Sequence, residues 1–271
     1  MRITPKGARW NGTVRMVPEH LADPLRWRKP RRIFVNSMSD LFHEALTNEQ
    51  IAAVFGVMAA APQHTFQVLT KRAKRMREYL QVDQRAEWSS ALARHHLAGE
   101  HPDMLCDQIQ FGDRVLPNVW LGVSVENQAA ADERVPDLIR TPAAVRFLSC
   151  EPLLGGVILQ GDEPPPALHS RSYLRGVTGD ERINWVIGGC ESGPGARDCD
   201  VAWLRSLRDQ CAAAAVPFFL KQAVSANPFN AAMHSVGIGA GGGSKRKAGG
   251  VIELPYLDGV QHAAFPELQH G

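Results

Sequence analysis

The sequence has no long apolar run. None of its hydrophobic stretches approaches the ~20 residues that a helix needs to cross a bilayer. Met1 is not followed by the apolar core of a secretory signal peptide. The five cysteines are scattered along the chain and odd in number, so they do not predict a disulfide framework. Together these absences predict a cytoplasmic protein without a membrane span.

Metal-binding spacings and a strong net charge are also missing. The sequence contains no CxxC or HxxxH pattern, and Cys190 and Cys199 are too far apart for a zinc knuckle. We therefore predict no metal site made by this chain. The net charge is +2, which sets no general demand for a polyanionic partner. The 271 residues suffice for one large α/β domain or two small ones.

Six short apolar runs alternate with helical patterns, which is typical of α/β proteins. The runs expected to form strands are 32–35, 65–69, 118–123, 145–148, 185–187 and 216–220. The segments expected to form helices are 48–61, capped by Asn48, then 73–98, 128–140 and 201–214, with 99–117 as a loop. We favour a partial (β/α) barrel of about six parallel strands over an open doubly wound sheet. The reason is that no glycine-rich dinucleotide fingerprint follows the first strand.

The composition divides the chain into four parts. Residues 1–30 are interrupted by proline and glycine and are expected to be an irregular connector. The barrel-like domain covers 31–236. Residues 237–250 are rich in glycine and are expected to be a flexible linker, and 251–271 form a C-terminal tail that packs on the domain.

Polar and often ionisable residues follow all six expected strands. In either architecture a ligand binds at the carboxyl ends of the strands, so we expect these residues to converge there. The expected ligand-binding residues are Asn36, Ser37, Asp40, Lys71, Ser124, Glu126, Glu151, Gly188, Gly189, Glu191, Ser192 and Lys221.

Three glutamates stand out in this set. Glu126, Glu151 and Glu191 each follow an apolar strand, and Lys71 and Lys221 are available to neutralise them. Buried carboxylates beside ammonium groups suit acid/base chemistry, metal binding, or contacts with the amino and carboxylate groups of a ligand. The alternative is a ring of salt bridges that closes the mouth of the barrel.

The stretch WVIGGCESGPGAR (185–197) combines a buried strand with a glycine-rich turn that leads into a helix. Asp198 and Asp200 are candidate caps for that helix. Glycines let backbone N–H groups approach a ligand, and a helix N-terminus favours an anion. A tight turn without a ligand remains the alternative, and a phosphate-ester enzyme using this turn is a third, weaker hypothesis.

Two basic runs favour contact with nucleic acid. Residues 26–32 and 71–77 each hold five cations in seven residues. In the first run Trp27 can stack on a base while the surrounding arginines hold phosphates. Those arginines are Arg26, Arg28, Arg31 and Arg32. In the second run we expect Lys71 and Arg72 to face the site and the other three cations to face solvent, which is also what an ordinary solvated helix would show.

Seven blocks taken together resemble a known family. They are PLRWRKPRRIFVNSMSDLFHE (24–44), FQVLTKR (66–72), LPNVWLGVSVEN (116–127), RFLSCEPLL (146–154), GGCESGPGAR (188–197), LRDQCAAAAVPFFLKQ (207–222) and LDGVQHAAFPE (257–267). The ordered set strongly resembles the phage and prophage family called gp thirty-seven/sixty-eight, which largely lacks an assigned function. The resemblance runs from about Val14 to Glu267.

That family is similar to radical S-adenosylmethionine enzymes, which have a related TIM-type barrel. The resemblance implies two cofactors, a [4Fe–4S] cluster held by three closely spaced cysteines and S-adenosylmethionine bound at the open iron. This sequence has no three-cysteine motif, and its five cysteines cannot be matched to the cluster ligands. We expect a truncated or mis-started chain that would be a radical enzyme only with the motif restored.

Two functions follow as hypotheses. In the first, the strand ends bind S-adenosylmethionine, with Glu126 or Glu151 contacting its amino group and the turn at 188–195 near its adenosine. In the second, the chain is a non-redox phage accessory protein that binds nucleic acid through its basic runs. No residue role is transferred from the family.

Overall fold

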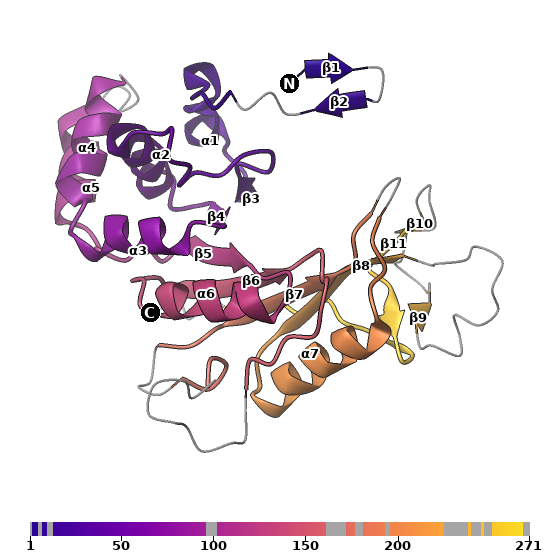
Figure 1. The fold of residues 1–271 in the computed structure, drawn as a ribbon. Coiled ribbons are helices and arrows are strands. Elements are labelled where there is room, and N and C mark those ends of the chain that lie inside the picture. Colours follow the sequence, from indigo (N-terminus) through magenta and orange to yellow (C-terminus); the bar gives the residue numbers. More distant parts are fainter. Residues whose placement is uncertain are drawn as a thin grey trace. The chain divides into compact units, whose positions relative to one another are not determined.

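The structure, a computed structural model, contains two compact units. The units are Met1–Trp120 and Leu121–Gly271, and each is described by itself. The described residues are 2–4, 7–9, 13–95, 102–160, 172–176, 181–192, 196–224, 238–239, 245–246 and 251–267. Figure 1 labels their helices and strands.

The first unit contains a short antiparallel hairpin, two parallel strands and four longer helices. Its elements are β1 (Arg2–Thr4), β2 (Gly7–Arg9), η1 (Pro18–His20), α1 (Asp23–Arg26), β3 (Arg32–Val35), α2 (Asn48–Ala60), β4 (Thr65–Thr70), α3 (Ala73–Gln81), α4 (Arg85–Arg94) and α5 (Pro102–Phe111). Strands β3 and β4 pair in parallel, with Arg32 opposite Thr65 and Val35 opposite Val68. In β4 alternate residues are buried, so one face of the strand packs in the core.

Three helix expectations differ from the structure. The segment 73–98 contains two helices, α3 and α4, with residues 82–84 between them. Helix α2 is capped by Thr47 rather than Asn48: Thr47 Oγ1 accepts from Gln50 N at 3.2 Å, and Gln50 Oε1 accepts from Thr47 N at 2.9 Å. The expected loop 99–117 contains helix α5, which starts at Pro102. Proline lacks only an N–H that the first turn would leave unpaired, so it begins a helix as readily as it breaks one.

An aromatic cluster fills the core of the first unit. Phe55 stacks on Trp88 with ring centroids 5.2 Å apart, and Trp88 Nε1 donates to the Tyr79 hydroxyl at 3.2 Å. Phe42 contacts the rings of Phe55 and Tyr79. A methyl group at Gly56 would lie 2.6 Å from the carbonyl oxygen of Trp88, so this glycine permits the close packing of α2 and α4 (Figure 1).

The second unit contains buried parallel strands and two helices. The division of the chain falls within β5 (Val119–Ser124); the elements that follow are α6 (Gln128–Ile139), β6 (Val145–Cys150), β7 (Trp185–Gly189), α7 (Val201–Ala213), β8 (Phe218–Val224), β9 (Ile238–Gly239), β10 (Lys245–Arg246), β11 (Val251–Glu253), β12 (Tyr256–Leu257) and β13 (Val260–Gln261). Every residue of β5, β6 and β7 is buried, as expected for parallel strands covered on both faces. Helix α7 packs on β7 and β8 (Figure 1).

The C-terminal segment contacts β7 and β8. Strand β11 pairs antiparallel with β8. Trp185 Nε1 donates to the carbonyl oxygen of Ala264 at 2.8 Å, and the Trp185 and Phe265 rings lie 4.9 Å apart. Most of the expected linker 237–250 lies outside the described residues.

The α/β class and the strand order are as predicted. Six parallel strands, β3 to β8, alternate with helices and keep chain order, β3–β4 in the first unit and β5–β6–β7–β8 in the second. This is the strand order of a partial (β/α) barrel.

Gly122 gives a test of the packing in β5. A methyl group there would lie 2.5 Å from ring carbons of Phe147, which is fully buried. We expect Gly122→Ala to lower the free energy of unfolding by about 1–3 kcal/mol, the usual cost of overpacking a core. Gly156→Ala is the control, because its methyl group would make an ordinary 3.5 Å contact with Trp203. Equal midpoints of guanidinium unfolding for both variants would contradict this packing.

Candidate functional site

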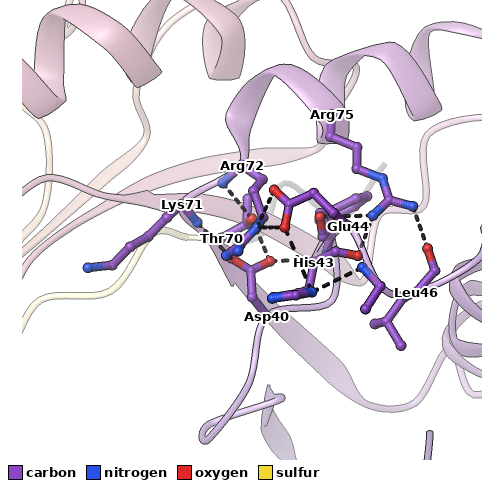
Figure 2. Close-up of polar contacts among 10 residues, drawn as sticks. Asp40, His43, Glu44, Leu46, Thr70, Lys71, Arg72 and Arg75 are labelled. Carbon is purple, nitrogen blue, oxygen red and sulfur yellow. Dashed lines mark hydrogen bonds and ion pairs between the residues drawn. The ribbon is translucent and has the colours of Figure 1, made fainter. Parts of the chain in front are cut away.

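In the first unit, the Asp40 carboxylate ties the loop after β3 to the end of β4 (Figure 2). Asp40 Oδ1 accepts from Phe42 N at 2.9 Å and from Thr70 Oγ1 at 2.7 Å. Asp40 Oδ2 accepts from Lys71 N and Arg72 Nη1, both at 3.0 Å. A carboxylate has about four acceptor positions, so this side chain is engaged within the protein. Asp40 thus contacts Lys71 only through the backbone N–H of Lys71, and its charge is paired with Arg72.

Two arginines of the second basic run, Arg72 and Arg75, hold the same loop. Arg72 also contacts the Glu44 carboxylate at 2.9 Å, and this hydrogen bond lowers the pKa of Glu44 to about 2. The expectation that Arg75 faces solvent is wrong, because its guanidinium is half-buried and bound to backbone carbonyls of the loop. Those carbonyls belong to Phe42, His43 and Leu46. Arg75 acts here because five donors in a fixed fork can reach several carbonyls at once.

Asn36 and Ser37 lie in the turn that follows β3. Asn36 has a left-handed backbone with φ of 57°, a conformation that asparagine tolerates better than most residues. Its carbonyl accepts from Ser39 N at 3.0 Å. Asn36 and Asp40 line the same cavity, whereas Ser37 is exposed.

The first basic run is exposed, but its tryptophan is already in contact with an arginine. The Arg31 guanidinium lies 4.4 Å from the centre of the Trp27 ring, and the His64 ring meets Trp27 edge-on at 5.9 Å. Arg26 pairs with Asp23 at 3.5 Å. Arg26, Arg28, Arg31 and Arg32 are all exposed.

In the second unit, Glu151 and Lys221 form an ion pair across β7. Glu151 directly follows β6 and Lys221 belongs to β8, and β7 runs between these strands. Lys221 Nζ lies 3.0 Å from Glu151 Oε2, with 11% of the glutamate side chain and 55% of the lysine side chain exposed. Gly189 makes this possible, because a methyl group there would lie 3.1 Å from Glu151 Cγ. Burial raises the pKa of Glu151 above its ordinary value, and the charge and hydrogen bond of Lys221 only partly offset that effect.

The other two strand-end glutamates are paired with arginines. Glu126 Oε2 lies 2.9 Å from Arg134 Nη1, which also donates to the Ser124 carbonyl at 2.9 Å. Arg197 grips Glu191 with Nε and Nη2, each 2.8 Å from a carboxylate oxygen. This contact lowers the pKa of Glu191 to about 2. Each of the three glutamates therefore has a cation of its own.

The described part of the glycine-rich turn is bound to β8. Cys190 N donates to the Gln222 carbonyl and Gln222 Nε2 donates back to the Cys190 carbonyl, both at 3.0 Å. A methyl group at Gly188 would lie 3.0 Å from the Phe218 ring. Ser192 is exposed, and residues 193–195 of the expected turn lie outside the described residues. Helix α7 follows the turn and is capped by Asp200, one of the two expected caps. Asp200 Oδ1 accepts from Ala202 N at 2.8 Å.

The cysteines do not assemble into a cluster site. Cys190 and Cys199 are joined by a thiol hydrogen bond that, with burial, raises the pKa of Cys199. Burial raises the pKa of Cys211 to about 12 and that of its neighbour Cys150 still further. Among the described residues, which include all five cysteines, no group of three or more metal-ligating side chains comes together. A [4Fe–4S] cluster does not fit these thiols.

Sequence reasoning missed the two arginines that neutralise the glutamates. Arg134 lies on α6, eight positions after Glu126, and Arg197 lies six positions after Glu191. Neither spacing is a recognised pair pattern, since each depends on how the chain turns after its strand. Lys221, in contrast, was among the expected partners and does pair with a glutamate.

Comparison with known proteins places the chain in a family. A family model described as "Protein of unknown function (DUF5131)" matches residues 2–266. The chain belongs to the DUF5131 family. No curated protein and no solved structure matches this DUF5131 chain. Within its described residues, none of the helices has the length and apolar character needed to cross a membrane.

Glu151 gives a pH test. Because the folded-state pKa of Glu151 is raised above 4.5, its contribution to stability is present below that value and is lost as pH rises through the folded pKa. We expect the wild type to lose unfolding free energy relative to Glu151→Gln as pH rises from about 4 to 8. Denaturant unfolding across this range measures the difference.

Glu191→Gln is the matched control with the opposite sign. The pKa of Glu191 is lowered to about 2, so its contribution is present above the unfolded-state pKa and is lost on acidification. A stability difference between the wild type and Glu151→Gln that stays constant with pH would contradict a raised pKa for Glu151.

Proposed function

We propose that the carboxyl ends of β6, β7 and β8 bind the amino-acid end of a small zwitterionic ligand, and that this ligand is S-adenosylmethionine. The observation that carries the proposal is the Glu151–Lys221 ion pair, 3.0 Å across, beside Gly189. A carboxylate and an ammonium group in this arrangement are complementary to the ammonium and carboxylate of an amino acid. The choice of S-adenosylmethionine rests on the resemblance to radical S-adenosylmethionine enzymes through the phage family.

The imbalance within the pair supports ligand exchange. Glu151 is largely buried and its pKa is raised, so Lys221 alone compensates its charge incompletely. A second ammonium group would relieve this cost. Lys221 is about half exposed, and a flexible lysine can leave Glu151 and turn to a ligand carboxylate.

The remaining strand-end residues have supporting roles in the proposal. In the proposal the adenosine lies near Glu191 and Ser192 at the end of β7, while Gly188 and Gly189 make room for the Phe218 ring and the Glu151 side chain. Ser124 and Glu126 border the neighbouring strand end, where Arg134 holds the Glu126 carboxylate. The proposal contains binding alone and no redox step, because the cysteines do not fit a cluster. It places the protein in the cytoplasm, where its free thiols stay reduced.

Isothermal titration calorimetry tests the proposed site. We expect Glu151→Gln to weaken S-adenosylmethionine binding about 10–100-fold, the worth of a hydrogen bond to a charged group. L-Methionine, which carries only the amino-acid end, should show the same loss. 5′-Methylthioadenosine lacks that end and should bind both forms equally.

Glu267→Gln is the control, an exposed glutamate in the same unit. It should bind all three ligands as the wild type does. Unchanged S-adenosylmethionine affinity in Glu151→Gln would refute the role of Glu151, and no binding by the wild type would refute the site.

Nucleic-acid binding is the second candidate, favoured by the exposed arginines of 26–32. We expect the chain to bind a single-stranded oligonucleotide with an affinity that falls steeply with salt concentration. Replacing the four arginines with alanine should abolish it, as measured by fluorescence anisotropy. An unaffected affinity would eliminate this function.

The stacking of Arg31 on Trp27 predicts phosphate contacts rather than base stacking on that face of the ring.

A further inference from the structure

The first unit contains a cavity of about 720 Å³ that the proposed strand-end site does not use. It is bounded by the segment 13–27, by β3 and the turn after it, and by α2. Cavities of roughly 300–1,000 Å³ are the size that accepts small organic ligands. The volume therefore suits a small molecule, and both walls come from described residues of one unit.

The walls are largely apolar. Residues from both sides contribute, among them Val14, Val17, Leu21, Leu46, Val54 and Met58. Val17 is 40% exposed and Met38, also at the wall, is 66% exposed, so the cavity opens to solvent on that side. Apolar surface exposed in a concave site is a feature that a bound apolar ligand would relieve.

The two carboxylates at the walls already have basic partners. Asp23 pairs with His20 at 3.0 Å and with Arg26 at 3.5 Å. Asp40 pairs with Arg72 at 3.0 Å. A cationic ligand would meet no uncompensated carboxylate here, so the cavity does not favour a cation.

Polar side chains that can donate hydrogen bonds also line the cavity. His43 lines the cavity, and its Nδ1 accepts from Ala45 N at 3.1 Å, so the neutral ring carries its proton on Nε2 (Figure 2). Gln50 accepts from Thr47 N with its Oε1, so its amide N–H groups are not used in that contact. Gln50 and Asn36 both line the cavity. Donors beside an apolar chamber match a ligand with a carbonyl or ring-nitrogen acceptor.

We propose that this cavity binds a neutral, mostly apolar heteroaromatic or carbonyl compound, with its acceptor directed at His43. The site is independent of the strand-end site in the second unit. It requires no reaction and no charged group on the ligand.

Nile red is the probe, because it is neutral, heteroaromatic and carries a carbonyl, and its fluorescence rises in apolar surroundings. We expect saturable one-to-one binding to the full chain. Val54→Trp from α2 and Leu21→Trp from the opposite wall should each weaken binding about tenfold or more by filling the chamber. Val82→Trp is the matched control, at a position 63% exposed and outside the cavity. Near-ultraviolet circular dichroism shows which variants keep the native packing. Because Val54 and Leu21 lie on different segments, one variant still tests the cavity if the other does not fold.

A second pair of measurements tests the acceptor. His43→Phe should weaken Nile red binding about three- to tenfold, the worth of one hydrogen bond, and leave the carbonyl-free probe N-phenyl-1-naphthylamine unaffected. Glu151→Gln should leave Nile red binding unchanged, which separates this site from the proposed S-adenosylmethionine site. Absent saturable binding in the wild type, or equal affinities in Val54→Trp, Leu21→Trp and Val82→Trp, would overturn the proposal.

Discussion

Burying a carboxylate costs free energy unless a cation accompanies it, and this cost constrains the strand ends of this protein. A parallel strand delivers its last side chain to the edge of a covered sheet, where an unpaired charge is costly. Each strand-end carboxylate described above has a basic partner within 3.0 Å. The pairs are Asp40 with Arg72, Glu126 with Arg134, Glu191 with Arg197 and Glu151 with Lys221. The turns after the strands are shaped by these pairs.

The four pairs differ in what they can do. Arginine binds a carboxylate with a rigid fork, as Arg197 does with Glu191, and such a pair holds a loop in place. Lysine presents a single flexible ammonium group. Glu151 is the carboxylate with a lysine partner among these pairs, and that partner comes from a strand that is not its neighbour. The Glu151–Lys221 pair thus combines the least rigid cation with a deeply buried carboxylate. The proposed ligand exchange is assigned to it for this reason.

Much of the fold follows from pattern alone. The apolar runs at 32–35 and 145–148 became β3 and β6, because branched and aromatic residues in short runs have few other stable arrangements. Local patterns failed where two arrangements compete over a few residues. Pro102 can end one element or begin another, and Thr47 and Asn48 are both good caps. At the start of α2, the Gln50 side chain accepts a hydrogen bond from Thr47 N, and this contact selects Thr47 as the cap.

The strand-end glutamates and the partner Lys221 could be named from the sequence, but the two arginine partners could not. Strand ends are visible in a sequence, so Glu126, Glu151 and Glu191 could be named in advance. Their partners depend on the path of the chain after each strand, which local spacing does not encode. The same limit applies to Arg75, whose place in a basic run suggested solvent, although the loop carbonyls nearby needed a donor.

The two glycines that end β7 show how an absent side chain can shape a site. At Gly188 the missing side chain makes room for the Phe218 ring, which is a packing role. At Gly189 it makes room for the Glu151 side chain, which a methyl group would crowd at 3.1 Å. If Gly189 had only a packing role, we would expect an apolar group in the space beside its Cα, as beside Gly188. Instead it is taken by a carboxylate with a raised pKa, so a side chain at position 189 would crowd the Glu151 side chain that reaches from β6 to Lys221 on β8. The glycine at position 189 is therefore explained by the Glu151 carboxylate group that packs against it.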